Sequence, residues 1–133
     1  VRVMFLKPTD PRTEASFRLI LQETPLGDPP PNTVATMLRL NLPVFVTPPG
    51  AKPRLVWSLH TAAGQTWLRV RNEGNAHAFV ASARGADGAD LPAISGYVLP
   101  GALREWPLAA PLSRLSYTLR EGDEVAAEVA VER

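Results

Sequence analysis

Prolines and glycines divide this sequence into short apolar runs. The chain has 133 residues, of which 14 are proline and 9 are glycine, and they cluster between the runs. Such clusters favour many short elements joined by turns. Within the runs, apolar and polar residues alternate with the two-residue period of β-strands, whereas helical spacing is hard to find. The sequence therefore predicts an all-β fold.

The charge balance and the residue types exclude several classes of function. The chain has 14 basic and 13 acidic residues, a net charge of +1, and its basic residues are scattered, so we expect no nucleic-acid binding. It has no run of 18 apolar residues, so we expect no membrane insertion. The absence of cysteine removes disulfides, thiol nucleophiles and cysteine-based zinc sites.

Catalytic and metal-binding motifs are missing as well. The sequence contains no nucleophile elbow, P-loop or dinucleotide fingerprint. The two histidines, His60 and His77, lack a third metal ligand at a suitable spacing, and we expect ordinary hydrogen bonds from both. Glu23 and Asp28 are the nearest approach to paired carboxylates, and they have no partner base. We therefore expect no enzyme, no metal site and no cofactor.

The C-terminal part of the chain predicts a complete immunoglobulin-like β-sandwich. Turn signals recur there at the spacing typical of a sandwich. Seven strands are expected, at residues 54–60, 65–71, 76–84, 96–99, 104–108, 113–119 and 125–131. Trp57 and Trp67 are the large core candidates.

The N-terminal part predicts only three strands, at residues 1–6, 17–22 and 33–46. Three strands bury too little apolar surface to stand alone with confidence. We therefore expect residues 1–47 to be the C-terminal part of a truncated first immunoglobulin-like domain. Residues 48–53 then form a linker stiffened by prolines, and residues 54–133 form the second domain.

The run at residues 33–46 is the feature that most favours a function. Its alternation places five side chains in one stripe: Val34, Thr36, Leu38, Leu40 and Leu42. Pro43 interrupts the run, and a strand proline belongs on an edge or at a bulge. A long apolar edge strand is suited to β-augmentation, in which backbone pairing gives affinity and alternate side chains give specificity.

Four segments resemble the periplasmic pilus-assembly chaperones of the chaperone–usher pathway. FRLILQETP at residues 17–25 is similar to the family's F-strand motif, and LRLNLPVFVTP at residues 38–48 to its subunit-binding G strand and the start of its interdomain linker. NEGNAH at residues 72–77 and VLPG at residues 98–101 match weaker motifs of the second domain. The phrase LPVFV is more similar to the branch of spore-coat-U-type secretion chaperones than to the P-pilus branch.

This resemblance implies a function without catalysis. Family members have two immunoglobulin-like domains and work in the periplasm. Their G strand replaces the strand that an incomplete pilus subunit lacks, before delivery to an outer-membrane usher. By position, Val34, Thr36, Leu38, Leu40 and Leu42 would be the side chains presented to the subunit.

The sequence departs from the family at the basic pair that anchors the subunit's terminal carboxylate. The aligned G-strand position is Pro43, and the first strand, which supplies the other basic residue, is missing. Arg18 and Arg39 lie nearby in the sequence, and arginine suits bidentate binding of a carboxylate. They are candidate substitutes for the anchor.

An alternative is a structural or adhesive immunoglobulin-like module of a surface protein. That interpretation predicts that Leu38, Leu40 and Leu42 are buried in a closed sandwich. The chaperone interpretation predicts that they are exposed. Because unpaired apolar edges recruit other chains, self-association through the exposed strand is a further expectation.

Overall fold

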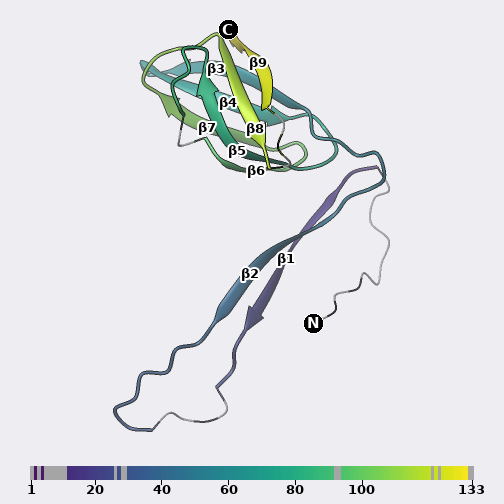
Figure 1. The fold of residues 1–133 in the computed structure, drawn as a ribbon, viewed down its shortest axis with the longest axis vertical. Coiled ribbons are helices and arrows are strands. Elements are labelled where there is room, and N and C mark those ends of the chain that lie inside the picture. Colours follow the sequence, from purple (N-terminus) through teal and green to yellow (C-terminus); the bar gives the residue numbers. More distant parts are fainter. Residues whose placement is uncertain are drawn as a thin grey trace.

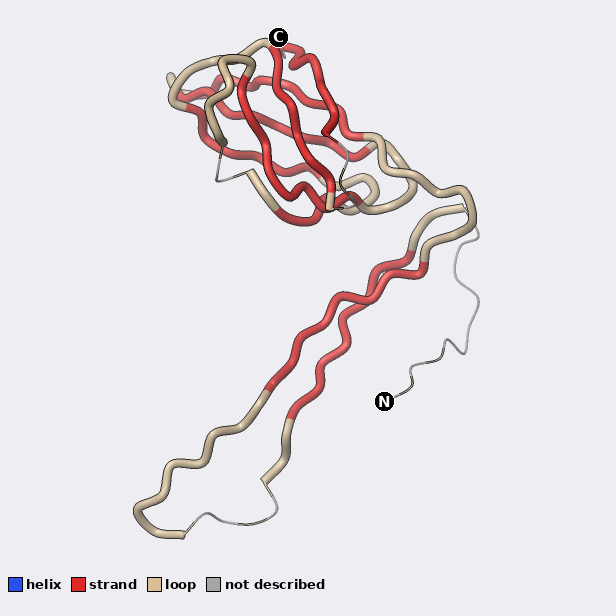
Figure 2. The backbone as a smooth tube through the Cα atoms, in the orientation of Figure 1, coloured by secondary structure: helices blue, strands red, loops and turns tan. Residues whose placement is uncertain are grey.

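The computed structural model describes residues 2, 4, 12–25, 27, 30–91, 94–120, 122 and 124–131. The described residues form nine β-strands and no helix (Figures 1 and 2). No helix long and apolar enough to cross a membrane is therefore present in this part of the chain. The prediction of an all-β fold is confirmed.

Strands β1 (Ala15–Gln22) and β2 (Arg39–Val46) pair with each other in an antiparallel two-stranded sheet. Figure 1 shows this ribbon extending away from a sandwich that contains the remaining strands. Because no other described strand joins this sheet, β1 and β2 each have a free edge within the described residues. Pro43 lies within β2, so its expected place on an edge strand is confirmed.

The strand predicted at residues 17–22 is observed and begins two residues earlier, at Ala15, whereas the second predicted strand is longer than the observed one. The run at residues 33–46 is a strand only from Arg39 onward. The opposite segment explains this, since β1 ends at Gln22 and Pro25 soon follows. A strand needs a paired neighbour, and proline has no N–H to donate. Most of the strand expected at residues 1–6 lies outside the described residues.

The seven other strands form the sandwich, in the order β6-β5-β8-β9-β3-β4-β7. A parallel pairing of β3 with β9 joins its two layers. Every strand bound agrees with the sequence prediction to within two residues. The strands are β3 (Leu55–Ala62), β4 (Gln65–Asn72), β5 (Ala78–Gly85), β6 (Gly96–Val98), β7 (Leu103–Leu108), β8 (Arg114–Leu119) and β9 (Glu124–Val131).

The core lies between the two layers and is centred on Trp57. This side chain is 2% exposed, and its ring lies 5.4 Å from that of Tyr117 and 6.3 Å from that of Trp106. The prediction for Trp67 is wrong, because it is only half-buried. Its strand neighbour Leu68 is fully buried, and successive side chains of a strand point to opposite faces.

Candidate protein-binding surface

The two faces of the β1–β2 ribbon differ in polarity. Residues directly opposite each other in an antiparallel pair lie on the same face. On one face Leu19 is opposite Leu42, and Leu21 is opposite Leu40. We call this the apolar face; its members in the two strands are Ala15, Phe17, Leu19, Leu21, Leu40, Leu42, Val44 and Val46. The other face has Arg18 opposite Pro43, Ile20 opposite Asn41, and Gln22 opposite Arg39.

The predicted stripe is exposed throughout. Leu40 is 39% and Leu42 43% exposed within β2, while Leu38, just before the strand, is 54% exposed. Val34 is 95% exposed, and Thr36 is exposed as well. The burial expected for a closed structural module is not found in this chain. A continuous exposed apolar surface of this kind makes the ribbon a candidate protein-binding surface.

Glu23 closes the ribbon at the end away from the sandwich. Its backbone N–H donates to the carbonyl of Leu38 at 2.9 Å, and its carboxylate Oε2 accepts from the N–H of Leu38 at 2.8 Å. Glu23 is thus a backbone partner of Leu38, and Asp28, the other carboxylate considered in the sequence, lies outside the described residues. Beyond this contact, exposed residues 33–37 have no strand pairing in the described part of the chain.

A cleft of about 390 Å³ lies where the ribbon meets the sandwich. Arg18 of β1 and Arg104 of β7 both line it. Arg18 donates to Asn41 Oδ1 at 3.4 Å, and Arg104 donates to the carbonyl of Tyr97 at 3.1 Å. The lining contains no carboxylate; its residues are Ser16, Phe17, Arg18, Pro43, Phe45, Tyr97, Leu99 and Arg104.

Arg39, the second predicted anchor, is not among the residues that line this cleft. Arg18 is opposite Pro43, and Pro43 is four residues from Arg39 along β2. Four residues of strand span about 13 Å. The structure therefore separates Arg18 from Arg39 and brings Arg18 to the same cleft as Arg104.

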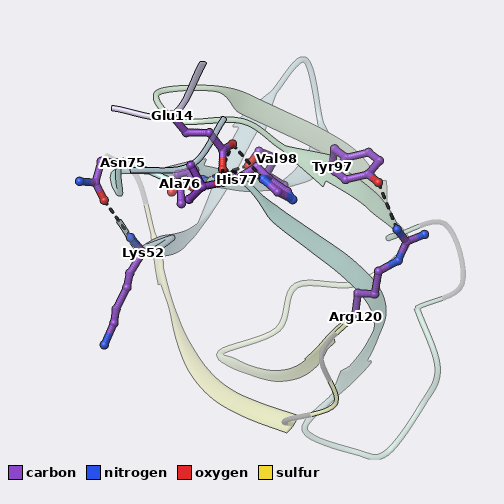
Figure 3. Close-up of polar contacts among 10 residues, drawn as sticks. Glu14, Lys52, Asn75, Ala76, His77, Tyr97, Val98 and Arg120 are labelled. Atoms are coloured by element: carbon purple, nitrogen blue, oxygen red, sulfur yellow. Dashed lines mark hydrogen bonds and ion pairs between the residues drawn. The ribbon is translucent and has the colours of Figure 1, made fainter. Parts of the chain in front are cut away.

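Glu14 joins the base of the ribbon to the sandwich. Its side chain is fully buried, and it accepts hydrogen bonds from the backbone N–H of His77 at 3.0 Å and from Thr47 Oγ1 at 2.7 Å. The His77 Nδ1 atom lies 2.8 Å from Glu14 Oε1 (Figure 3). Glu14 precedes β1, Thr47 follows β2 and His77 precedes β5. One carboxylate thus connects both ribbon strands to the sandwich.

The ionised form of Glu14 is favoured at this position. Burial by itself raises the pKa of the carboxyl group, because desolvation penalises the charge. The hydrogen bonds from Thr47 and His77, together with the charge of the imidazole, outweigh burial, so that the pKa of Glu14 lies below its ordinary value. The carboxylate is therefore ionised at neutral pH and holds its three contacts.

Aromatic rings form a second connection beside Glu14. The ring of Phe45 in β2 stacks on His77 with 3.7 Å between ring centres, and Tyr97 of β6 lies 5.3 Å from Phe45. Arg120 donates to the Tyr97 hydroxyl at 3.2 Å (Figure 3) and lies over the ring of Phe79. The expected ordinary hydrogen bonding of His77 is confirmed.

The turn after β4 fixes the linker. Asn72 is fully buried; its Oδ1 accepts from the N–H of Arg54 and of Gly74, and its Nδ2 donates to the carbonyls of Ala76 and Val98. A Cβ on Gly74 would lie 2.3 Å from the carbonyl oxygen of Lys52. Glycine at this position therefore lets the linker pack against the turn.

Sequence reasoning did not identify Glu14, Phe45 or Arg104 as functional candidates. Glu14 is a single acidic residue before a strand, and Arg104 is one of many scattered arginines, so neither gave a local signal. The NEGNAH segment at residues 72–77 is one of the weaker motifs of the resemblance. The structure shows that it supplies Asn72, Gly74 and His77 to the junction between the ribbon and the sandwich. Within the described residues, no group of three or more His, Asp or Glu side chains could hold a metal ion.

The fold is similar to that of a solved pilus chaperone. The match is to the chaperone in the crystal structure of the CsuC–CsuE chaperone–tip adhesion subunit pre-assembly complex from the archaic chaperone–usher Csu pili of Acinetobacter baumannii. The TM-score is 0.65, the sequence identity is 22%, and 96% of this chain is covered. No protein-family model and no curated protein sequence matches this chain.

This comparison confirms the immunoglobulin-like fold class expected from the sequence. The similar structure is itself a chaperone of a chaperone–usher pathway, and the likeness to it is one of fold. The match spans 64% of the length of the CsuC chain, so this chain corresponds to about two thirds of that protein.

Proposed function

We propose that this chain is part of a periplasmic, non-enzymatic chaperone that binds pilus or fimbrial subunits and delivers them to an outer-membrane usher. One observation carries the proposal. The ribbon presents a half-exposed apolar face, which includes Leu40 and Leu42, on a strand with a free edge among the described residues. The fold it shares with a chaperone that was solved with a tip adhesion subunit supports the same role.

The mechanism follows from the geometry of a strand. A free edge offers backbone N–H and C=O groups to an extended segment of a partner. Side chains at every second residue, about 6.8 Å apart, can fill a groove in that partner. In this proposal the groove receives Val34, Thr36, Leu38, Leu40 and Leu42. Covering the subunit's own open edge would prevent its aggregation.

The proposal includes the division of the chain into two units and a linker. Residues 1–47 contribute the subunit-binding strand, residues 48–53 the linker, and residues 54–133 the second immunoglobulin-like domain. The contacts of Glu14, Phe45 and Gly74 support a fixed orientation of the ribbon on this domain. A ribbon held in one orientation loses less conformational entropy when a partner binds.

We further propose Arg18 together with Arg104 as the cationic site for a carboxylate of the subunit. Both line the cleft at the base of the ribbon. Neither guanidinium has a carboxylate partner within the described part of the chain. This pair takes the place of the predicted pair of Arg18 and Arg39.

Co-purification from the native host tests the proposal. The full gene product, tagged at its C-terminus, is expressed in the periplasm and captured, and the bound proteins are identified by mass spectrometry. We expect a stoichiometric β-rich subunit, which is lost in the double variant Leu38→Asp, Leu40→Asp. Leu103→Asp is the matched control, because Leu103 is 42% exposed but lies in β7 of the sandwich.

Two outcomes contradict the proposal. One is a monomer without subunit, under conditions in which the neighbouring genes are expressed. The other is loss of the subunit to the same extent in Leu103→Asp as in the double variant. The first outcome favours a passive immunoglobulin-like module.

A further inference from the structure

The hydrogen-bonding phase of β2 determines which of its backbone groups face outward. In an antiparallel pair, successive residues direct their N–H and C=O groups alternately toward the neighbour and away from it. Glu23 N–H donates to the carbonyl of Leu38, so the backbone N–H and C=O groups of Leu38 point toward β1. By alternation Leu40 and Leu42 also face β1, whereas Arg39 and Asn41 direct their backbone groups to the free edge.

The backbone of Pro43 points to the free edge, as the backbone groups of Arg39 and Asn41 do. It is opposite Arg18 in an uninterrupted register, and its missing N–H therefore falls on the free edge, where the β1–β2 pairing loses nothing. A strand that adds to this edge meets donors at Arg39 and Asn41 but none at Pro43. A carbonyl of the added strand opposite Pro43 would stay unpaired, which disfavours continued pairing.

We propose that Pro43 ends the backbone pairing between β2 and the partner strand. We call this role of Pro43 a register stop. This inference rests on the proposed function, in which an extended segment of a separate subunit adds to β2. The added strand pairs with residues 37–41 and ends before Pro43. Since Pro43 also lines the cleft with Arg18 and Arg104, the stop keeps the cleft free of strand pairing.

The edge of β2 is favoured over that of β1 by the segment that precedes it. Residues 33–37 continue the line of β2 and are exposed, with Val34 at 95% and Met37 at 54%. No described strand pairs with them. On the other strand, pairing ends at Glu23 and Pro25 follows two residues later. A partner strand thus finds a longer free edge along β2.

A tethered probe strand tests the stop and does not require the natural subunit. The chain has no cysteine, so Ala35→Cys provides a unique thiol. A disulfide joins this thiol to the peptide Cys-Gly-Gly-(Thr-Val)5, whose ten-residue strand of about 33 Å can reach Phe45. Amide hydrogen exchange is then measured by NMR, residue by residue, with and without the probe.

We expect exchange at Arg39 and Asn41 to slow about fivefold or more, as for one added backbone hydrogen bond, and exchange at Phe45 to stay unchanged. In Pro43→Val, protection extends to position 43 and to Phe45. In Asn41→Pro, protection ends at Arg39; the ribbon keeps its own hydrogen bonds because the N–H at position 41 faces outward. Slow exchange of the core amide of Val70 verifies folding of each variant.

Protection of Phe45 equal to that of Asn41 in the parent chain would overturn the register stop and leave the proposed function intact. The register stop would also be overturned, with the proposed function intact, if Pro43→Val and Asn41→Pro both showed the same pattern of protection as the parent chain. If the probe slows exchange at none of the outward-facing amides, Arg39, Asn41 and Phe45, in any variant, the edge of β2 does not accept a strand. That result would overturn the proposed function as well.

Discussion

The imidazole ring of His77 lies against the ring of Phe45, with ring centres 3.7 Å apart and planes inclined by 17°. Phe45 belongs to β2 of the ribbon, and His77 precedes β5 of the sandwich. The stack therefore connects the proposed binding strand to the part of the chain that would orient it. An aromatic pair contributes about 0.5–1.5 kcal/mol beyond its buried area.

Removing this stack should loosen the ribbon. In Phe45→Ala we expect a broader distribution of distances between spin labels on cysteines that replace Gln22 and Thr61, measured by double electron–electron resonance. Ile20→Ala is the control, because Ile20 is 47% exposed in the middle of the ribbon. An unchanged distribution in Phe45→Ala would show that the stack does not orient the ribbon.

The Glu14 carboxylate should make the junction sensitive to acid. Its pKa is lowered from the ordinary 4.5, so the native state favours the ionised form. The stabilisation is complete above about pH 4.5 and is lost as the pH falls through the lowered native pKa. The protection factor of the His77 amide, whose N–H donates to Glu14, should fall in that acid range once the intrinsic pH dependence of exchange is divided out.

Glu14→Gln is the matched variant for this effect. It keeps the size of the side chain and removes the titration, so the protection factor of the His77 amide should already be lower at pH 7 and should no longer fall in acid. The amide of Val70 in the core reports on global unfolding under the same conditions. The same acid dependence in both proteins would exclude Glu14 as its source.

Gly74→Ala should destabilise the chain by about 1–3 kcal/mol, the usual cost of forcing added atoms into a packed site. The new Cβ would lie 2.3 Å from the Lys52 carbonyl oxygen and 2.5 Å from the Arg54 nitrogen, both backbone atoms. Urea unfolding followed by tryptophan fluorescence measures the difference. Gly27→Ala is the control, since a Cβ there meets nothing within 4 Å; an equal effect of both substitutions would contradict the steric account.

Asn72→Ala should be at least as damaging. It removes four hydrogen bonds and leaves buried backbone groups at Ala76 and Val98 without their partner. Each such group costs about 1–3 kcal/mol when unsatisfied. Urea unfolding checks this as well, with the exposed Asn41→Ala as control. A loss below about 1 kcal/mol in Asn72→Ala would contradict the structural role.

The sandwich could be predicted from the sequence because its strands have one buried face. Burial of Leu68 and Val70 between half-buried or exposed residues gives β4 the two-residue alternation from which the strand was predicted. Among the aromatic residues, Trp57 could be predicted as buried, but Trp106 could not. Trp67 and Trp106 are both apolar, and only the register of β4 with β7 decides that Trp106 points inward.

The ribbon and the junction were predictable only in part. The stripe of Leu38, Leu40 and Leu42 is visible in the sequence, but the start of β2 depends on where β1 ends. Glu14 and His77 are 63 residues apart, and tertiary structure alone brings them together. A single acidic residue carries no sequence signal for such a contact.

Site-specific photo-crosslinking in the native host tests the central claim most directly. A photoreactive phenylalanine analogue replaces Leu38, Leu40 or Leu42 on the proposed binding strand, or Ile20 on the opposite face as control. The account predicts that the three leucine positions crosslink to one and the same pilus subunit and that Ile20 does so weakly. Crosslinks of equal strength at Ile20, or no subunit at any leucine position, would contradict it.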